Sequence, residues 1–163
     1  MQAYEVGDYA KSRQLRRVVR PDPVAGPGEA LVRVRVTGPN ARDFAIWATG
    51  ISKGEPPSEP TFIPMCDFAG DVLAVGPGVT EVAPGDRVTM IHYSSWLDGQ
   101  WHTDMRHVDY GRTRDGFLRE LAVVPAASLV RVPESVPYEH AATLPSAGLT
   151  AWHRWRSLLE LAH

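Results

Sequence analysis

Hydrophobic and polar residues alternate with a period of two over much of the first 132 positions. The clearest case is the segment 30–37, ALVRVRVT, where the alternation puts Arg33 and Arg35 on the same face. Such a pattern is typical of a β-strand with one face in the core and the other in water. Shorter segments of the same kind predict further strands at 2–6, 15–19, 71–75, 87–91, 116–124 and 129–132.

Turn-forming residues separate these segments. The chain holds 14 Gly and 14 Pro, and they recur between the alternating stretches, as in 26–28 and 84–86. Gly and Pro supply the backbone conformations of tight turns. Between two such strands, the segment 41–49 gathers Phe44, Ile46 and Trp47 and predicts one or two helical turns.

The pattern changes after Pro133. Residues 137–161 are rich in Ala, Leu, Trp and Glu, which predicts a short helix near 138–142 and a longer one from 146 to 161. We therefore expect a β domain over 1–133 and a helical segment over 134–163. Residues 50–61 and 92–115 have no clear period. The second of these loops is long, and long loops in compact domains are often functional.

The composition narrows the function classes. With 44% hydrophobic and 22% charged residues, the chain has the balance of a folded domain, and its net charge of −2 gives no electrostatic case for binding nucleic acid or a membrane surface. No apolar run reaches the roughly 18 residues of a membrane span. One cysteine excludes an internal disulfide, and the N-terminal residues show no secretion signal, so we expect a cytoplasmic protein.

Four segments, taken in order, resemble one family. The second is the most specific, because it combines D-F-A-G-x-V with V-G-x-G-V and P-G-D-R-V at fixed spacings. They are GPGEALVRVRVTGPNARDFAI (26–46), IPMCDFAGDVLAVGPGVTEVAPGDRV (63–88), GFLRELAVVPAASLVRVPESVPYEHAATLP (116–145) and SAGLTAWHRW (146–155). Together they resemble the N-terminal catalytic domain of the medium-chain dehydrogenase/reductase superfamily, in its zinc-independent, quinone-oxidoreductase-like branch. The resemblance implies a mainly β fold with flanking helices: a GroES-like, partly open β-barrel over 1–133, then an interdomain helical segment over 134–163.

The resemblance also indicates where zinc-using relatives would hold their catalytic metal. Those positions carry Asn40, Cys66 with Asp67, and Ser146. Only Cys66 is a good zinc ligand, whereas a catalytic zinc needs three protein ligands. The long loop adds further potential ligands, whose spacing matches no compact metal motif: His92, His102, Asp104 and His107. We therefore expect no metal.

The chemistry that the resemblance implies is hydride transfer from a nicotinamide cofactor, expected to be NADP(H), to a small carbonyl or quinone substrate. The candidate catalytic residues are Asn40, Arg42, Asp43 and Tyr93. Asn40 would face the nicotinamide and the substrate, since an amide both donates and accepts hydrogen bonds. Relatives in this branch often carry a tyrosine where this chain has Ala41, so His92 or Tyr93 would have to replace it as proton donor. For Asp43, pairing with Arg42 or capping of the helix is the alternative to catalysis.

Further positions are expected to complete the site. The predicted substrate pocket consists of Cys66, Asp67, His92 and Trp96, and the predicted cofactor contacts are Asn40, Ser146 and Thr150. Structural roles are open for several of these residues: Cys66 as a small buried hydrophobe, Asp67 as a partner of Arg42 or of a turn, and Ser146 as a helix cap. Tryptophans 47, 152 and 155 are expected in the core or at an interface.

A dinucleotide-binding βαβ unit with a glycine-rich turn is absent from the sequence pattern. Gly76-Pro77-Gly78 contains a G-x-G, but it lies between strands with no helix after it. We therefore expect the cofactor-binding Rossmann domain to be missing or supplied by a partner chain. The isolated fragment is expected to be inactive, and the complete enzyme to be a homodimer. The alternative is a non-enzymatic GroES-like module for binding or oligomerisation.

Overall fold

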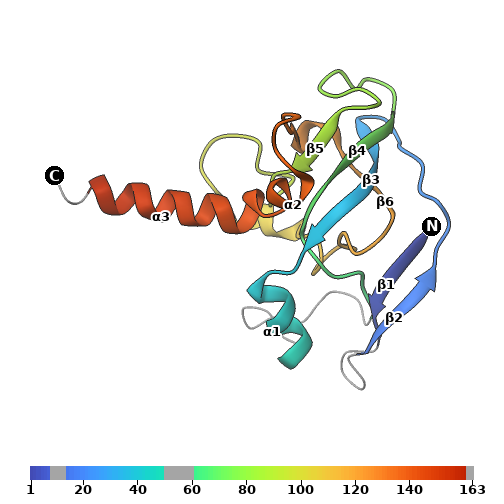
Figure 1. The fold of residues 1–163 in the computed structure, drawn as a ribbon, viewed down its shortest axis with the longest axis horizontal. Helices are drawn as coiled ribbons and strands as arrows, with labels where there is room; N and C mark the ends of the chain where they lie inside the picture. Colours follow the sequence, from blue (N-terminus) through green and yellow to red (C-terminus); the bar gives the residue numbers. More distant parts are fainter. Residues whose placement is uncertain (8–13, 50–60, 161–163) are drawn as a thin grey trace.

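A five-stranded antiparallel sheet forms the centre of the molecule. The computed structural model describes residues 1–7, 14–49 and 61–160 (Figure 1). The strand order in the main sheet is β6-β3-β4-β5-β7, and every neighbouring pair is antiparallel. These strands are β3 (Glu29–Gly38), β4 (Asp67–Val75), β5 (Arg87–Met90), β6 (Leu121–Pro125) and β7 (Leu129–Arg131). A separate hairpin pairs β1 (Gln2–Val6) with β2 (Leu15–Val19).

Three α-helices accompany the sheets in the part of the chain that the structure describes. They are α1 (Ala41–Thr49), directly after β3, then α2 (Tyr138–Ala141) and α3 (Leu149–Glu160). Figure 1 shows α3 extending away from the β domain, with the C-terminus at its far end. Among the described residues, no helix has the length and apolar character needed to cross a membrane.

The core lies on the inward face of the main sheet, where the alternating apolar residues meet. Val32, Val72 and Val88 have at most 1% of their surface exposed. The rings of Phe68 and Phe117 lie beside them, with their centroids 4.4 Å apart. These contacts confirm the period-two interpretation and the predicted mainly β fold with flanking helices.

Two elements begin at later residues than the sequence predicts. The strand expected at 116–124 starts only at Leu121, because the backbone of 116–118 bonds instead to residues 63–65, for example from Gly116 N–H to the Ile63 carbonyl at 2.6 Å. The long C-terminal helix starts at Leu149, because residues 144–148 form one π-helical turn that contains Pro145. Ser146 lies inside this turn, so its predicted role as a helix cap is wrong.

The tryptophans of α3 are on the surface. Trp152 and Trp155 are 55% and 56% exposed, so of their two expected locations the core of this domain is excluded, and an interface stays a prediction. The side chain of Trp47 lies outside the described part of the structure.

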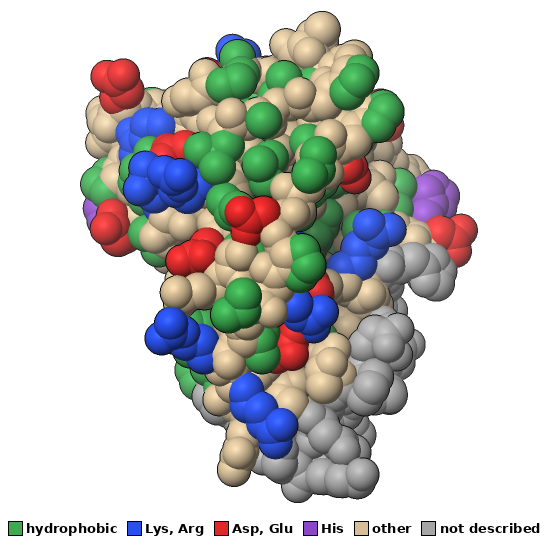
Figure 2. Space-filling view, turned by 90° about the vertical axis from the view of Figure 1, so that its right-hand side faces the viewer, with side chains coloured by type: hydrophobic (Ala, Val, Ile, Leu, Met, Phe, Trp, Pro, Cys, Tyr) green, Lys and Arg blue, Asp and Glu red, His purple; other side chains and the backbone are tan. Residues whose placement is uncertain are grey.

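Figure 2 shows a different face, where Lys or Arg and Asp or Glu side chains are interspersed with apolar ones. That mixture agrees with the absence of an electrostatic case for nucleic acid on this face.

Gly70 allows β3 and β4 to approach closely. A Cβ at this position would lie 2.0 Å from the Arg33 carbonyl oxygen, a distance that no real side chain reaches. Gly78 is different, because it has a φ of +82° and open space around it. Position 70 therefore needs glycine because there is no room for a side chain, whereas position 78 favours glycine because of its backbone conformation.

We expect Gly70→Ala to destabilise the fold by at least about 3 kcal/mol, because the backbone of a central strand pair would have to shift. Gly78→Ala should cost only about 1 kcal/mol, the strain of a left-handed alanine. Urea unfolding followed by circular dichroism measures both. Equal losses for the two variants would contradict the close approach at Gly70.

Candidate functional site

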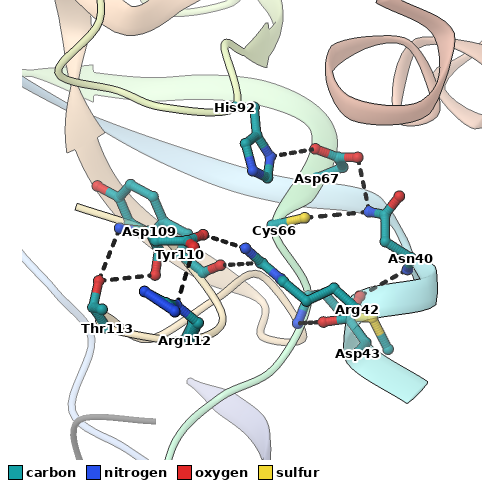
Figure 3. Close-up of polar contacts among 11 residues, drawn as sticks. Asn40, Arg42, Asp43, Cys66, Asp67, His92, Asp109, Tyr110, Arg112 and Thr113 are labelled. Carbon is teal, nitrogen blue, oxygen red and sulfur yellow. Dashed lines mark hydrogen bonds and ion pairs between the residues drawn. The ribbon is translucent and has the colours of Figure 1, made fainter. Parts of the chain in front are cut away.

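A polar cluster forms where β3 ends, β4 begins and β5 ends (Figure 3). Because β3 and β4 are antiparallel, Gly38 pairs with Asp67, which brings Asn40 beside the first residue of β4. The pairing of Ala69 with Thr89 likewise brings the end of β5 to the same edge. The topology therefore brings together Asn40, the adjacent residues Cys66 and Asp67, and His92, from three separate segments of the chain.

The side-chain amide of Asn40 bridges two of these residues. Its Nδ2 donates to Cys66 Sγ at 3.2 Å and to Asp67 Oδ2 at 2.9 Å. The carboxylate of Asp67 is 2% exposed, so Asn40 partners a buried negative group. A buried carboxylate needs such donors, since leaving it unpaired is costly. The predicted pairing of Asp67 with Arg42 is not observed.

Asp43 holds the backbone of Asn40 and Met65 in place. The backbone N–H of Asn40 donates to Asp43 Oδ2 at 2.7 Å, and the Asp43 N–H donates to the Asn40 carbonyl at 2.9 Å. Asp43 Oδ1 also accepts from the Met65 N–H at 3.2 Å, where Met65 has a φ of 74°. Burial raises the pKa of Asp43, and these backbone hydrogen bonds act against that rise. The predicted capping role of Asp43 is therefore confirmed.

Asp67 and His92 lie close together without a hydrogen bond between them. Asp67 Oδ1 and His92 Nδ1 are 3.9 Å apart, which is too long for a hydrogen bond. Both atoms are buried and have no hydrogen-bond partner. An unpaired buried polar atom costs about 1–3 kcal/mol, so this pair stands out from the rest of the cluster, whose polar atoms are bonded.

The same residues raise the question of a metal ion. One ligand atom from each of Cys66, Asp67 and His92 lies within 4.8 Å of the others. The Asn40 amide directs its hydrogens at two of the three, and burial raises the pKa of the Cys66 thiol to about 12, although the nearby Arg42 lowers it in part. Zinc binds the thiolate form.

Arg42 belongs to a second, buried network. Its Nη1 pairs with Asp109 Oδ1, and its Nη2 donates to the Tyr110 carbonyl at 2.6 Å. Arg112 Nε lies 3.2 Å from the other oxygen of Asp109, and Thr113 Oγ1 accepts from the Asp109 N–H at 2.9 Å. These contacts fasten the far part of the loop 92–115 to α1. The catalytic role predicted for Arg42 stays a prediction.

Sequence reasoning missed Asp109 and Arg112. The loop 92–115 is polar and aperiodic, and nothing in the sequence marks these two side chains as buried at 4% and 6% exposure. Their spacing of three residues is the only available signal, and it is common on surfaces. Of the loop's other predicted ligands, His102 and Asp104 are exposed, and the side chain of His107 lies outside the described residues.

The remaining predicted site residues lie in different parts of the fold. The ring of Tyr93 contacts that of His92 edge-on, with centroids 4.5 Å apart, so Tyr93 borders the cluster. Trp96 is 41% exposed and donates from Nε1 to the Gly99 carbonyl at 3.1 Å. Thr150 Oγ1 donates to the Ser146 carbonyl at 2.6 Å, a bond inside the helical segment. Their predicted contacts with cofactor and substrate stay predictions.

Comparison with known proteins matches this architecture. Residues 26–134 match the model of the alcohol dehydrogenase GroES-like domain. The chain belongs to this family. It is 36% identical over 129 residues, 78% of its length, to a zinc-type alcohol dehydrogenase-like protein of Schizosaccharomyces pombe, of which it covers 36%. The domain is the N-terminal part of medium-chain dehydrogenases/reductases, so the chain is a member of that superfamily.

Solved structures agree with this assignment. A crystal structure from Sinorhizobium meliloti named as an alcohol dehydrogenase is 34% identical, with a TM-score of 0.78 over 93% of this chain and 44% of that protein. A thermostable alcohol dehydrogenase of Pyrobaculum aerophilum with bound cobalt and zinc is 32% identical, with a TM-score of 0.72 over 93% of this chain and 46% of that one. The alcohol dehydrogenase-like domain thus spans less than half the length of each of these relatives.

The thiol of Cys66 offers a direct test of the cluster. Because it is 2% exposed and its pKa is raised to about 12, we expect negligible reaction with iodoacetamide in the native domain at pH 8, and a rate that keeps rising with pH above 9. Mass spectrometry with and without urea measures this cleanly, since the chain has one cysteine. Rapid labelling of the folded domain at pH 8 would contradict the buried, neutral thiol.

The ion pair of Arg42 with Asp109 should matter for stability. Arg42→Met leaves Asp109 buried with only Arg112 as a charged partner, and we expect a loss of about 3–5 kcal/mol in the free energy of unfolding. Arg131→Met is the matched control, because Arg131 pairs with Asp86 while its side chain is 61% exposed. The control should change stability much less. Similar urea midpoints for the two variants would refute the structural role of Arg42.

Proposed function

We propose that the chain is the substrate-side domain of an NAD(P)H-dependent oxidoreductase that transfers hydride to or from a small carbonyl, quinone or alcohol without a catalytic zinc. The pair of Asp67 and His92 carries this proposal, because one polar atom of each side chain is buried without a hydrogen-bond partner at the edge of the domain. Membership of the alcohol dehydrogenase-like family supports the reaction class. The quinone-oxidoreductase-like branch and a preference for NADP(H) remain parts of this proposal.

The cofactor would be bound by a Rossmann domain outside residues 1–163 or on a partner chain. In support, all strand pairs among the described residues are antiparallel, whereas a dinucleotide-binding unit requires parallel strands. Leu149, Trp152 and Trp155 are more than half exposed along α3, and the two indole rings lie 5.7 Å apart. An apolar stripe of this kind favours association. We propose that it packs on the cofactor domain, in a homodimeric cytoplasmic enzyme.

The residues of the cluster would then have distinct tasks. The nicotinamide, when bound, supplies the hydride. Asn40 holds the Asp67 carboxylate through Oδ2, so that Oδ1 stays directed at His92. His92, whose Nδ1 lies 3.9 Å from Asp67 Oδ1, is the first candidate to give a proton to the substrate oxygen. Tyr93, in edge contact with the imidazole, is the second candidate for this step and lines the substrate pocket.

A chimera tests this function. The N-terminal domain of the Sinorhizobium meliloti relative would be replaced by residues 1–148 of this chain, which keeps the relative's own cofactor domain. We expect oxidation of NADPH or NADH with a panel of aldehydes, quinones and conjugated ketones, and a loss of about 10²-fold or more in kcat for His92→Phe. The isolated 163-residue chain should show no turnover.

The control is cofactor binding by the chimera, measured by fluorescence titration. A folded chimera that binds NAD(P)H but reduces nothing in the panel would overturn the proposed function. That result would favour a binding or oligomerisation module. Turnover that survives His92→Phe but not Tyr93→Phe would leave the function intact and move the proton transfer to Tyr93.

A further inference from the structure

We infer that Tyr138 is a positioning residue: by bonding to Asp71 it fixes α2 along β4, and it thereby sets the direction in which α3 leaves the domain. The inference rests on the proposed function, in which α3 packs on the cofactor domain. It adds a residue that acts through the placement of α2 and not at the reacting atoms.

The hydroxyl of Tyr138 belongs to a polar network on the face of the sheet away from the main core. Tyr138 Oη donates to Asp71 Oδ1, and Arg35 Nε donates to Asp71 Oδ2 at 2.7 Å. Burial alone would raise the pKa of Asp71, but these two bonds lower it overall, so the carboxylate is charged at neutral pH. Hydrogen bonds to a charged group are stronger than neutral ones. The start of α2 is therefore tied to one defined point of β4.

Arg87 of β5 reinforces the same contact. Its guanidinium carbon lies 4.2 Å from the centre of the Tyr138 ring, within the range of a cation–π interaction. Its Nη1 donates to the Pro133 carbonyl at 3.0 Å, and its Nη2 donates to the Val136 carbonyl at 2.8 Å. Arg87 thus holds the segment that enters α2, while the Tyr138 hydroxyl holds the first residue of the helix itself.

From this end, α2 follows β4 to the candidate site. Ala141 and Ala142, at the other end of the helix, are at most 1% exposed and pack against Ala69. A Cβ at Gly38 would lie 3.9 Å from the Ala142 carbonyl oxygen, and Gly38 is the residue that pairs with Asp67. Figure 1 shows α2 against β3 and β4, with α3 leading away. Alanine side chains pack closely but do little to stop a helix from sliding, so the bond of Tyr138 determines where α2 lies along β4.

The chain after α2 transmits this placement. The π-helical turn 144–148 follows the helix and leads directly into α3. The Gly148 N–H donates to the Thr143 carbonyl at 3.0 Å, and Thr150 Oγ1 donates to the Ser146 carbonyl at 2.6 Å, so hydrogen bonds connect α2 to α3 without a break. A shift of α2 would move the start of α3 and the domain packed on it. Hydride transfer requires reacting atoms about 3–3.5 Å apart, so a small shift lowers the rate.

The first experiment compares the chimera described above with its Tyr138→Phe variant. The substitution removes the hydroxyl and keeps the ring in contact with Arg87. We expect kcat to fall about 10-fold while the Kd for NAD(P)H changes less than about 2-fold, because the cofactor domain stays intact and only its placement changes. Tyr4→Phe is the matched control, since it removes the same group from a residue that is 41% exposed on β1 and should leave kcat unchanged.

The second experiment needs no reaction and uses the 163-residue chain. The Ala142 N–H donates to the Tyr138 carbonyl inside α2, and the Val72 N–H donates to the Asp86 carbonyl in the β domain, both at 2.9 Å. Hydrogen exchange followed by NMR should be about 10-fold faster at Ala142 in Tyr138→Phe, with Val72 unchanged. Asp71→Asn should also accelerate exchange at Ala142. The double variant should exceed neither single effect by much, because both residues act through one bond.

The outcomes separate this inference from the proposed function. Unchanged exchange at Ala142 in Tyr138→Phe would overturn the inference, and so would an equal rise at Val72, which would mean global unfolding. Faster exchange with an unchanged kcat in an active chimera would also overturn it, because Tyr138 would then only stabilise the domain. A chimera that is inactive with Tyr138 in place would overturn the proposed function instead, and exchange at Ala142 would still decide whether Tyr138 fixes α2.

Discussion

The antiparallel pairing of β3 with β4 is the constraint on which the rest of the structure depends. The two strands approach so closely that only glycine fits at position 70, against the carbonyl of Arg33. Their register pairs Gly38 with Asp67, and therefore fixes which residues after β3 meet which residues at the start of β4. A slip of one residue would turn the side chain of Asp67 to the other face of the sheet and separate it from Asn40. The core and the polar cluster thus follow from one strand pair.

The first turn of α1 supplies the side chains that complete the site beside this strand pair. Within four residues, Asn40 reaches the cluster, Arg42 reaches Asp109 and Asp43 holds the backbone of both Asn40 and Met65. Buried ion pairs contribute little net stability, because the desolvation of both charges offsets their attraction. Here the ion pair positions the loop 92–115. Arg42 fixes the C-terminal part of this loop, and His92 lies at its N-terminal end. The helix therefore connects the loop and the sheet edge around the polar cluster.

The sequence predicted those features that depend on local pattern and failed where distant segments meet. Period-two alternation located the strands. The strand predicted through 116–120 failed because alternation does not reveal which backbone is the partner, and this stretch bonds to 63–65 instead. Asp109 was not placed for a related reason: its partner Arg42 is 67 residues away, and a loop without a period gives no register. The π-helical turn at 144–148 shifted the start of α3 by an amount that helix propensity does not encode.

The character of the polar cluster bears on the substrate that the proposed function can accept. A cation polarises a carbonyl strongly, whereas hydrogen bonds to a charged group contribute about 1.5–3 kcal/mol each. In the proposed zinc-free enzyme, the polarisation available to a substrate oxygen would come from His92 beside Asp67. Conjugated ketones and quinones accept hydride with less assistance than simple ketones, since the developing negative charge is delocalised over the conjugated system. A site without a cation would therefore favour substrates that are activated by their own electronic structure.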